Sequence, residues 1–115
     1  MLNNTEIRKV FDCLNKLKLG YHFGYAGSYA RGQASENSDL DILVKGQDIL
    51  SSNAYFTIYH TLKKVLPINF DIVDLTALEQ DDLIMDKKLL EMGLNINAES
   101  AYKTMKNDVI WMDGE

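Results

Sequence analysis

The chain has 115 residues, of which 46% are hydrophobic and 25% are charged. This composition is typical of an ordinary soluble globular protein and excludes disorder as the default state. The length predicts one domain over residues 1–115, large enough for a single hydrophobic core. The net charge of −5, from 12 basic and 17 acidic residues, argues against a nucleic-acid partner, because proteins that bind phosphate backbones normally carry a basic patch.

The sequence also predicts a cytoplasmic location. No apolar run approaches the ~20 residues that are needed to cross a bilayer, so no membrane partner is expected. The first residues lack the basic and apolar regions of a signal peptide. The single cysteine, Cys13, cannot form an internal disulfide and is expected to be a small packed side chain.

The hydrophobic pattern predicts an α/β (α+β) fold, with a mixed, twisted sheet backed by helices. Asn4 or Thr5 is the expected N-cap of the first helix, and Thr76 that of a later one. Tyr55 and Tyr59 are expected on the core face of the second helix. In chain order, the expected elements are a helix over 4–18, strands over 21–26 and 39–45, a helix over 51–66, a strand over 68–75, helices over 77–84, 86–92 and 99–106, and an apolar segment over 109–112 against the sheet.

Two aspartates flank Leu40 at the start of the second predicted strand. Aspartate is depleted in strands, and residues at i and i+2 project from the same face. Two carboxylates at such a short separation raise each other's pKa unless a cation lies between them. Ser38-Asp39 also suits a loop N-cap, but Asp41 lies inside the strand, where that explanation does not apply. Asp39 and Asp41 therefore suggest a metal site.

A third carboxylate lies inside the third predicted strand. Asp71 is in mid-strand, whereas Asp74 comes at the end, where a turn or helix cap explains it more simply. Asp71 is the preferred candidate, and Asp74 stays open as the alternative. Three carboxylates at one sheet edge suit Mg²⁺ held together with substrate phosphates. Two such ions ~4 Å apart can clamp the attacking and leaving oxygens of a displacement at phosphorus.

Gly27 and Ser28 interrupt the first strand and lead into helix-compatible residues through Arg31. We expect a helix start here whose backbone N–H groups bind phosphate, with glycine permitting close approach and Ser28 adding a hydroxyl donor. Arg31 can contact a triphosphate or pair with a carboxylate of the loop or strand. A Gly-Ser pair alone is a common turn, so the prediction depends on its combination with Asp39, Asp41 and Asp71.

This combination resembles the signature of the polymerase-β-type nucleotidyltransferase superfamily, and within it the minimal nucleotidyltransferases (MNT) of prokaryotes. The resemblance covers nearly the whole chain and implies a polymerase-β-like nucleotidyltransferase fold, with ATP as nucleotide donor and two Mg²⁺ ions. The residues that carry it are Gly27-Ser28, the following Tyr29-Ala30-Arg31-Gly32, and, nine residues after Ser28, Ser38-Asp39-Leu40-Asp41.

The resemblance also implies roles for these residues. Asp39 and Asp41 would bind both metal ions, while Asp71 would complete one metal site and help deprotonate the attacking hydroxyl. Gly27 and Ser28 would hold the β- and γ-phosphates. The remaining nucleotide-binding residues expected from the motif are Arg31 and Ser38.

Small members of this family resemble the antitoxin half of two-gene toxin–antitoxin modules. That likeness implies a HEPN-type toxin as partner, in a hetero-oligomer, and transfer of AMP from ATP to a tyrosine of the toxin. Two alternatives stay open on the sequence. One is a small-molecule nucleotidyltransferase of the aminoglycoside-modifying kind, and the other is a non-enzymatic neutraliser that binds the toxin and keeps the site as a nucleotide sensor.

Overall fold

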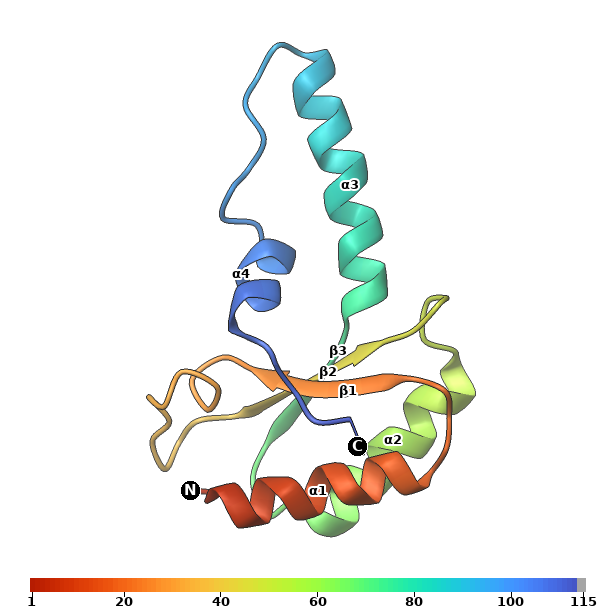
Figure 1. Ribbon diagram of the computed structural model, residues 1–115, viewed down its shortest axis with the longest axis vertical. Coiled ribbons are helices and arrows are strands. Elements are labelled where there is room, and N and C mark those ends of the chain that lie inside the picture. The colour runs from red at the N-terminus through yellow and green to blue at the C-terminus, as the bar shows by residue number, and fades with distance from the viewer. Residues whose placement is uncertain (114–115) are drawn as a thin grey trace.

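The computed structural model describes residues 1–113, which form a sheet with helices on both sides (Figure 1). The observed order of helices and strands follows the prediction except between residues 75 and 91, where one helix replaces two predicted ones. The elements are α1 (Asn4–Lys16), β1 (His22–Ala26), β2 (Leu40–Lys45), α2 (Ser52–Val65), β3 (Phe70–Asp74), α3 (Leu75–Glu91), α4 (Ala101–Asp108) and β4 (Ile110–Trp111).

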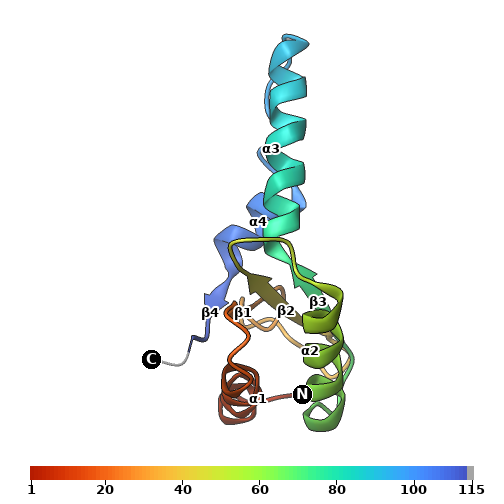
Figure 2. The same ribbon diagram turned by 90° about the vertical axis from the view of Figure 1, so that its right-hand side faces the viewer.

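The sheet has the strand order β3-β2-β1-β4. Strand β2 pairs in parallel with β3, and β1 pairs antiparallel with both β2 and β4. The predicted mixed sheet is thereby confirmed. Helices α1 and α2 lie side by side beneath one face of the sheet, as the two orthogonal views show (Figures 1 and 2). The side chains sealed between these helices and the sheet include Phe11, Leu14, Leu40, Ile42 and Ile58, none of which is exposed.

Helices α3 and α4 lie on the opposite side of the sheet, where α3 projects away from the body as an arm (Figure 2). The molecule is consequently elongated, with extents of 47 × 31 × 24 Å. The base of α3 is anchored by Leu75, which packs with Ala26 and Leu43 in a small second core. Apolar side chains farther along the arm, such as Leu83 and Leu90, are exposed.

The first helix begins at Asn4, as predicted, but its N-cap precedes both predicted caps. Asn3, rather than Asn4 or Thr5, is the N-cap, and its side chain accepts a hydrogen bond from the backbone N–H of Glu6. The Glu6 carboxylate in turn accepts from the backbone N–H of Asn3 at 3.0 Å. This reciprocal pair is a capping box, which satisfies two backbone donors at once and so outcompetes the neighbouring caps.

The prediction of two short helices after residue 76 was wrong. One continuous helix, α3, covers this stretch, and its N-cap is Asp74 rather than Thr76. The Asp74 carboxylate accepts from the backbone N–H of Ala77 at 3.1 Å. The Thr76 hydroxyl is used elsewhere, since it donates to the carbonyl of Gly46 at 3.1 Å and fixes the turn after β2.

The core face of α2 is narrower than predicted. Ile58 and Leu62 are fully buried, but Tyr55 is 38% exposed and Tyr59 is only partly buried. The apolar segment predicted over 109–112 is confirmed as strand β4, and Met112 beyond it is buried.

The C-terminal end is held in place as far as Asp113, the last residue that the structure describes. Asp113 accepts from the backbone N–H of Phe23 at 3.2 Å and lies 2.9 Å from Nδ1 of His22. Gly114 and Glu115 lie outside the described residues. Over residues 1–113, no helix combines the length and apolar character that a membrane span requires.

Candidate active site

The sheet brings the predicted carboxylates into one row. Asp41 on β2 is the register partner of Ala26 on β1 and of Asp71 on β3. Adjacent strands lie ~4.8 Å apart, and register partners in a parallel pair project from the same face. Asp39 precedes β2 and lies two residues before Asp41, so it projects from that face as well. Asp39, Asp41 and Asp71, which we call the carboxylate row, therefore converge on one patch of the sheet.

Asp41 is the member of the carboxylate row whose pKa is affected by the charges of both other members. Burial raises the pKa of Asp41, and the neighbouring charges of Asp71 and then Asp39 raise it further, while Arg31 opposes the shift. A cation bound beside these carboxylates would favour the ionised form of Asp41. Perturbation by burial together with specific charged neighbours is typical of functional sites.

Gly27 lies against the Asp41 carboxylate, immediately after β1. Its φ of +77° is a backbone conformation that glycine adopts readily and other residues resist. A Cβ on Gly27 would collide with Oδ2 of Asp41. The sequence thus places glycine here for two reasons, its backbone angle and the space that Asp41 fills.

The helix start predicted at Gly27-Ser28 is absent. Residues 27–32 form consecutive turns, in which the carbonyl of Gly27 accepts from the N–H of Arg31 and that of Ser28 accepts from the N–H of Gln33. Gly32, with φ +70°, ends this stretch. A phosphate at Gly27-Ser28 would therefore meet the N–H groups of a tight turn, which can also bind anions, instead of a helix dipole.

The structure places the other predicted nucleotide-binding residues on the loop between β1 and β2. The Ser38 hydroxyl accepts from the backbone N–H of Ser35 at 2.9 Å and closes the loop before Asp39. Arg31 donates to the carboxylate of Asp108 on α4 at 2.7 Å. Its ion-pair partner is thus on a helix, where the sequence suggested a loop or strand carboxylate.

The two candidates for the third carboxylate have different surroundings. Asp74 is engaged twice, since it caps α3 and its other oxygen accepts from the backbone N–H of Leu50 at 2.8 Å. Its register partner is Val44, three residues along β2 from Asp41. Asp71 is exposed and lies directly beside Asp41. The geometry therefore favours Asp71 as the member of the carboxylate row.

Residues 1–113 contain no ready-made group of three metal-binding side chains at coordination distance. The donor set nevertheless fits Mg²⁺, which prefers oxygen ligands and is usually held by one or two carboxylates together with water and substrate phosphates. The raised pKa of Asp41, caused first by burial and then by the charges of Asp71 and Asp39, also fits, because a cation would offset both effects by stabilising the ionised carboxylates. Asp39 and Asp41 are the residues that would hold the ion, with Asp71 beside them.

A cavity of about 310 Å³ adjoins the carboxylate row. Asp39 and Asp71 line one side of it, and Tyr59 and Lys63 of α2 line another. Sequence reasoning missed this role for Tyr59, because an aromatic residue at helical spacing is usually a core residue. The lining also depends on how α2 packs against β3. The sequence pattern of neither element predicts that packing.

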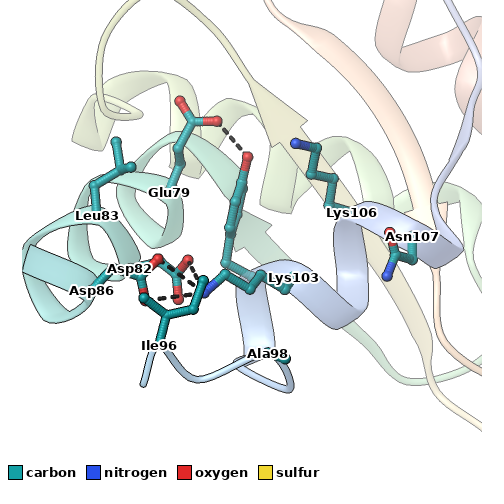
Figure 3. Close-up of a pocket in the computed structure, with 10 residues that line it drawn as sticks. Glu79, Asp82, Leu83, Asp86, Ile96, Ala98, Lys103, Lys106 and Asn107 are labelled. Atoms are coloured by element: carbon teal, nitrogen blue, oxygen red, sulfur yellow. Dashed lines mark hydrogen bonds and ion pairs between the residues drawn. The ribbon is translucent and has the colours of Figure 1, made fainter. Parts of the chain in front are cut away.

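A larger cavity, of about 540 Å³, lies between α3 and α4 and contains none of the predicted site residues (Figure 3). There the ammonium group of Lys103 lies within 3.4 Å of Asp82 and 2.9 Å of Asp86. The Tyr102 hydroxyl donates to Glu79 at 2.5 Å, which raises the pKa of Tyr102 to about 12. These paired groups fasten α4 to α3, so their role in the fold is structural.

Comparison with known proteins identifies related sequences. Residues 5–107 match the family model described as "Polymerase beta, Nucleotidyltransferase". Protein adenylyltransferase MntA of Shewanella oneidensis is 31% identical over 117 residues, covering 85% of this chain and 82% of the relative. Protein adenylyltransferase MntA of Thermococcus cleftensis is 33% identical over 84 residues, covering 69% of this chain and 84% of the relative.

Two solved structures share the fold. A toxin–antitoxin crystal structure with AMP-PNP matches with a TM-score of 0.50 at 25% identity, covering 80% of this chain and 87% of that chain. A mutant of the toxin–antitoxin MntA-HpeT matches with a TM-score of 0.62 at 20% identity, covering 99% of this chain and 75% of that chain. The family model spans most of the chain, including the whole carboxylate row, so this chain belongs to the polymerase beta nucleotidyltransferase family.

Proposed function

We propose that this protein transfers AMP from ATP to a tyrosine hydroxyl of a HEPN-type toxin and thereby acts as its antitoxin in the cytoplasm. The observation that carries the proposal is the row in which Asp41 stands between Gly27 and Asp71. Two relatives at 31% and 33% identity are named protein adenylyltransferases. A structure of similar fold is a toxin–antitoxin bound to the ATP analogue AMP-PNP, which supports ATP as the donor.

In the proposed reaction, different residues of one domain bind the phosphates and accept the proton. The turn N–H groups at Gly27-Ser28 and the Ser28 hydroxyl bind the β- and γ-phosphates. Asp71 accepts the proton of the attacking hydroxyl. The hydroxyl oxygen then forms a bond to the α-phosphorus while the bond from that phosphorus to the pyrophosphate oxygen breaks. This is catalysis by positioning and charge, without a covalent enzyme intermediate.

The carboxylate row provides the place for two Mg²⁺ ions. When bound by Asp39 and Asp41, Mg²⁺ would neutralise the charge that develops on the transferred group and on pyrophosphate. Arg31 is 44% exposed in its ion pair, so its guanidinium can exchange Asp108 for a phosphate. Ser38 holds the loop that leads into Asp39 and completes the nucleotide-binding set.

Labelling separates this proposal from its alternatives. The protein is incubated with α-labelled ATP, Mg²⁺ and the product of the neighbouring gene, in parallel with the Asp39→Ala, Asp41→Ala double variant. We expect label on the partner with the native protein and none with the variant. Toxin neutralisation by the variant at native strength would instead support a binding-only antitoxin. Label on an aminoglycoside and on no protein would support a small-molecule enzyme.

A further inference from the structure

Helix α4 lies on the face of the sheet from which the carboxylate row projects. Side chains alternate along a strand, so Asp41 and Leu43 project from the same face of β2. Leu43 belongs to the second core, and Tyr102 of α4 and Val109, the residue that follows α4, pack against that core. Figure 2 shows α3 and α4 together on this side of the sheet. Helix α4 and the carboxylate row therefore share one face.

The last residue of α4, Asp108, lies beside the turn that is expected to bind phosphate. Strand β4 pairs with β1 so that Ile110 is opposite Tyr25. Two residues outward from that pair, Asp108 comes to the end of β1 at which Gly27 lies. The ion pair agrees with this placement, because Arg31 donates to Asp108 at 2.7 Å. The backbone N–H of Arg31 in turn donates to the carbonyl of Gly27 at 3.1 Å.

Arg31 is in a position to bind either Asp108 or a phosphate. Its charge opposes the raised pKa of Asp41, so Arg31 acts electrostatically on the carboxylate row as well as on α4. Carboxylate and phosphate oxygens are alternative acceptors for the same guanidinium group. The Asp108 side chain is 23% exposed, so it has access to solvent when it leaves Arg31.

The position of Asp108 is unfavourable for the helix itself. The C-terminal end of a helix carries a partial negative charge, and an acidic side chain there destabilises the last turn. Asp108 is the final residue of α4, which has only eight residues and so little stability of its own. Arg31 compensates for the charge of Asp108. A ligand that takes Arg31 away would leave that charge uncompensated and loosen the last turn of α4.

We propose that Asp108 occupies Arg31 in place of a phosphate until the nucleoside triphosphate binds and displaces it. The proposal rests on the proposed function, since it takes ATP as the donor. Displacement frees the C-terminal end of α4 from the β1–β2 loop. The other end of α4 stays attached to α3 through Tyr102 and Lys103. Nucleotide binding at the phosphate turn is thereby transmitted to α4, whose last turn becomes looser.

The first test measures the affinity for AMP-PNP with Mg²⁺ by calorimetry in the native protein, in Asp108→Asn and in the control Glu91→Gln. Both substitutions remove one negative charge, but Glu91 is exposed at the far end of α3. We expect Asp108→Asn to lower the Kd about threefold to fivefold, on the scale of a partly exposed ion pair. Glu91→Gln should leave the Kd unchanged.

A double-mutant cycle with Arg31→Met tests whether Asp108 acts through Arg31. In the Arg31→Met background, Asp108→Asn should improve the affinity much less than it does in the native background. An equal or larger improvement there would show that Asp108 repels the nucleotide without acting through Arg31, and it would overturn the proposal. An unchanged Kd in the single variant Asp108→Asn would overturn it as well.

The second test measures amide hydrogen exchange by NMR with and without saturating AMP-PNP and Mg²⁺. The N–H of Val109 donates to the carbonyl of Met105 at 2.9 Å and reports on the last turn of α4. The N–H of Lys103 donates to the Ser100 hydroxyl in the first turn and is the control. We expect the nucleotide to accelerate exchange at Val109 about threefold or more, with no change at Lys103. The acceleration should be absent in Asp108→Asn.

Neither test involves a partner protein or AMP transfer, so failure of this inference is distinguishable from failure of the proposed function. Binding of AMP-PNP with unchanged or slower exchange at Val109 would overturn the inference and leave the proposed function standing. The expected changes without transfer of AMP to any protein would support the role of Asp108 and count against the proposed function. Absence of AMP-PNP binding in every variant would overturn both.

Discussion

Gly27 and Asp41 are in such close contact that a single methyl group does not fit between them. A Cβ at residue 27 would collide with Oδ2 of Asp41, although the two residues are separated by the whole β1–β2 loop. The contact holds the turn that would bind phosphate against the carboxylate that would bind metal. The positions of these two groups are therefore coupled.

Gly27→Ala should accordingly abolish activity as well as reduce stability. We expect at least a 100-fold loss in kcat/KM, on the scale of losing one preorganised electrostatic partner. The free energy of unfolding should fall by about 1–3 kcal/mol through overpacking and the positive φ. Gly20→Ala is the matched control, because Gly20 has φ +83° but open space around it. If both variants retain activity, the contact with Asp41 is dispensable.

Asp41→Asn should inactivate the enzyme and stabilise the fold at neutral pH. Because the pKa of Asp41 is raised in the folded state, its ionised form opposes folding, and this unfavourable contribution develops as pH rises from the ordinary value of about 3.9 through the raised one. The asparagine removes that contribution. Thermal unfolding measured between pH 3 and pH 8 should show the melting temperature of the variant exceeding that of the native protein only on the neutral side. A variant less stable at every pH would contradict this account.

Arg31 and Asp108 can be separated by two substitutions. Arg31→Met should raise KM for ATP about tenfold or more, because a charged hydrogen bond to phosphate contributes ~1.5–3 kcal/mol. Asp108→Asn releases Arg31 without removing its charge, and KM for ATP should stay constant or fall. The free energy of unfolding of both variants should lie within about 1 kcal/mol of the native value, as is usual for a partly exposed ion pair. An unchanged KM for ATP in Arg31→Met would show that Arg31 does not contact the nucleotide and pairs with Asp108 only.

Lys103→Met should loosen the arm without affecting the carboxylate row. The substitution removes the cation that Asp82 and Asp86 share. The side chain of Asp82 is only 8% exposed. The hydrogen bond to Asp86 is the main cause that raises the pKa of Lys103 above 10.5, so its stabilising contribution persists through neutral pH and is lost only as pH rises above that value. Faster amide hydrogen exchange in α3 and α4 is the expected result.

Lys106→Met is the control for that experiment. Lys106 is on the same helix, and its ammonium lies over the ring of Tyr102 at 5.8 Å rather than between carboxylates. Its removal should change exchange rates much less. Adding Asp82→Asn to Lys103→Met should restore part of the protection, because it removes one of the two repelling charges. Equal exchange rates in both lysine variants would show that Lys103 does not fasten the arm.

The central part of the fold and of the carboxylate row could be predicted because its signals are local. Alternating residues define β2 and β3, and aspartates inside apolar strands are anomalies that are visible in the sequence. Asp71 could be preferred over Asp74 from its mid-strand position, and the register agrees, since Asp71 pairs with Asp41. The first helix was predicted from its apolar spacing, with an error of one residue in its cap.

The remaining features depend on contacts between distant residues. Thr76 is a plausible cap by sequence, but its hydroxyl bonds to Gly46, 30 residues away. The helix expected after Ser28 is replaced by turns, which return the chain toward β2. Lys103 meets Asp82 and Asp86 across the gap between two helices. No periodicity within one segment contains such information, so these features required the three-dimensional structure.

The arm begins at Leu75, four residues after Asp71, yet the arm and the carboxylate row are structurally independent. Asp74 closes the strand, caps α3 and accepts from Leu50, so the joint is fixed on both sides. Beyond Asp82 the helix is largely exposed and has no buried residue. Its length could change by whole turns of ~5.4 Å without moving the carboxylates. The domain is therefore modular: the length of the outer arm and the geometry of the carboxylates at its base are set by separate contacts.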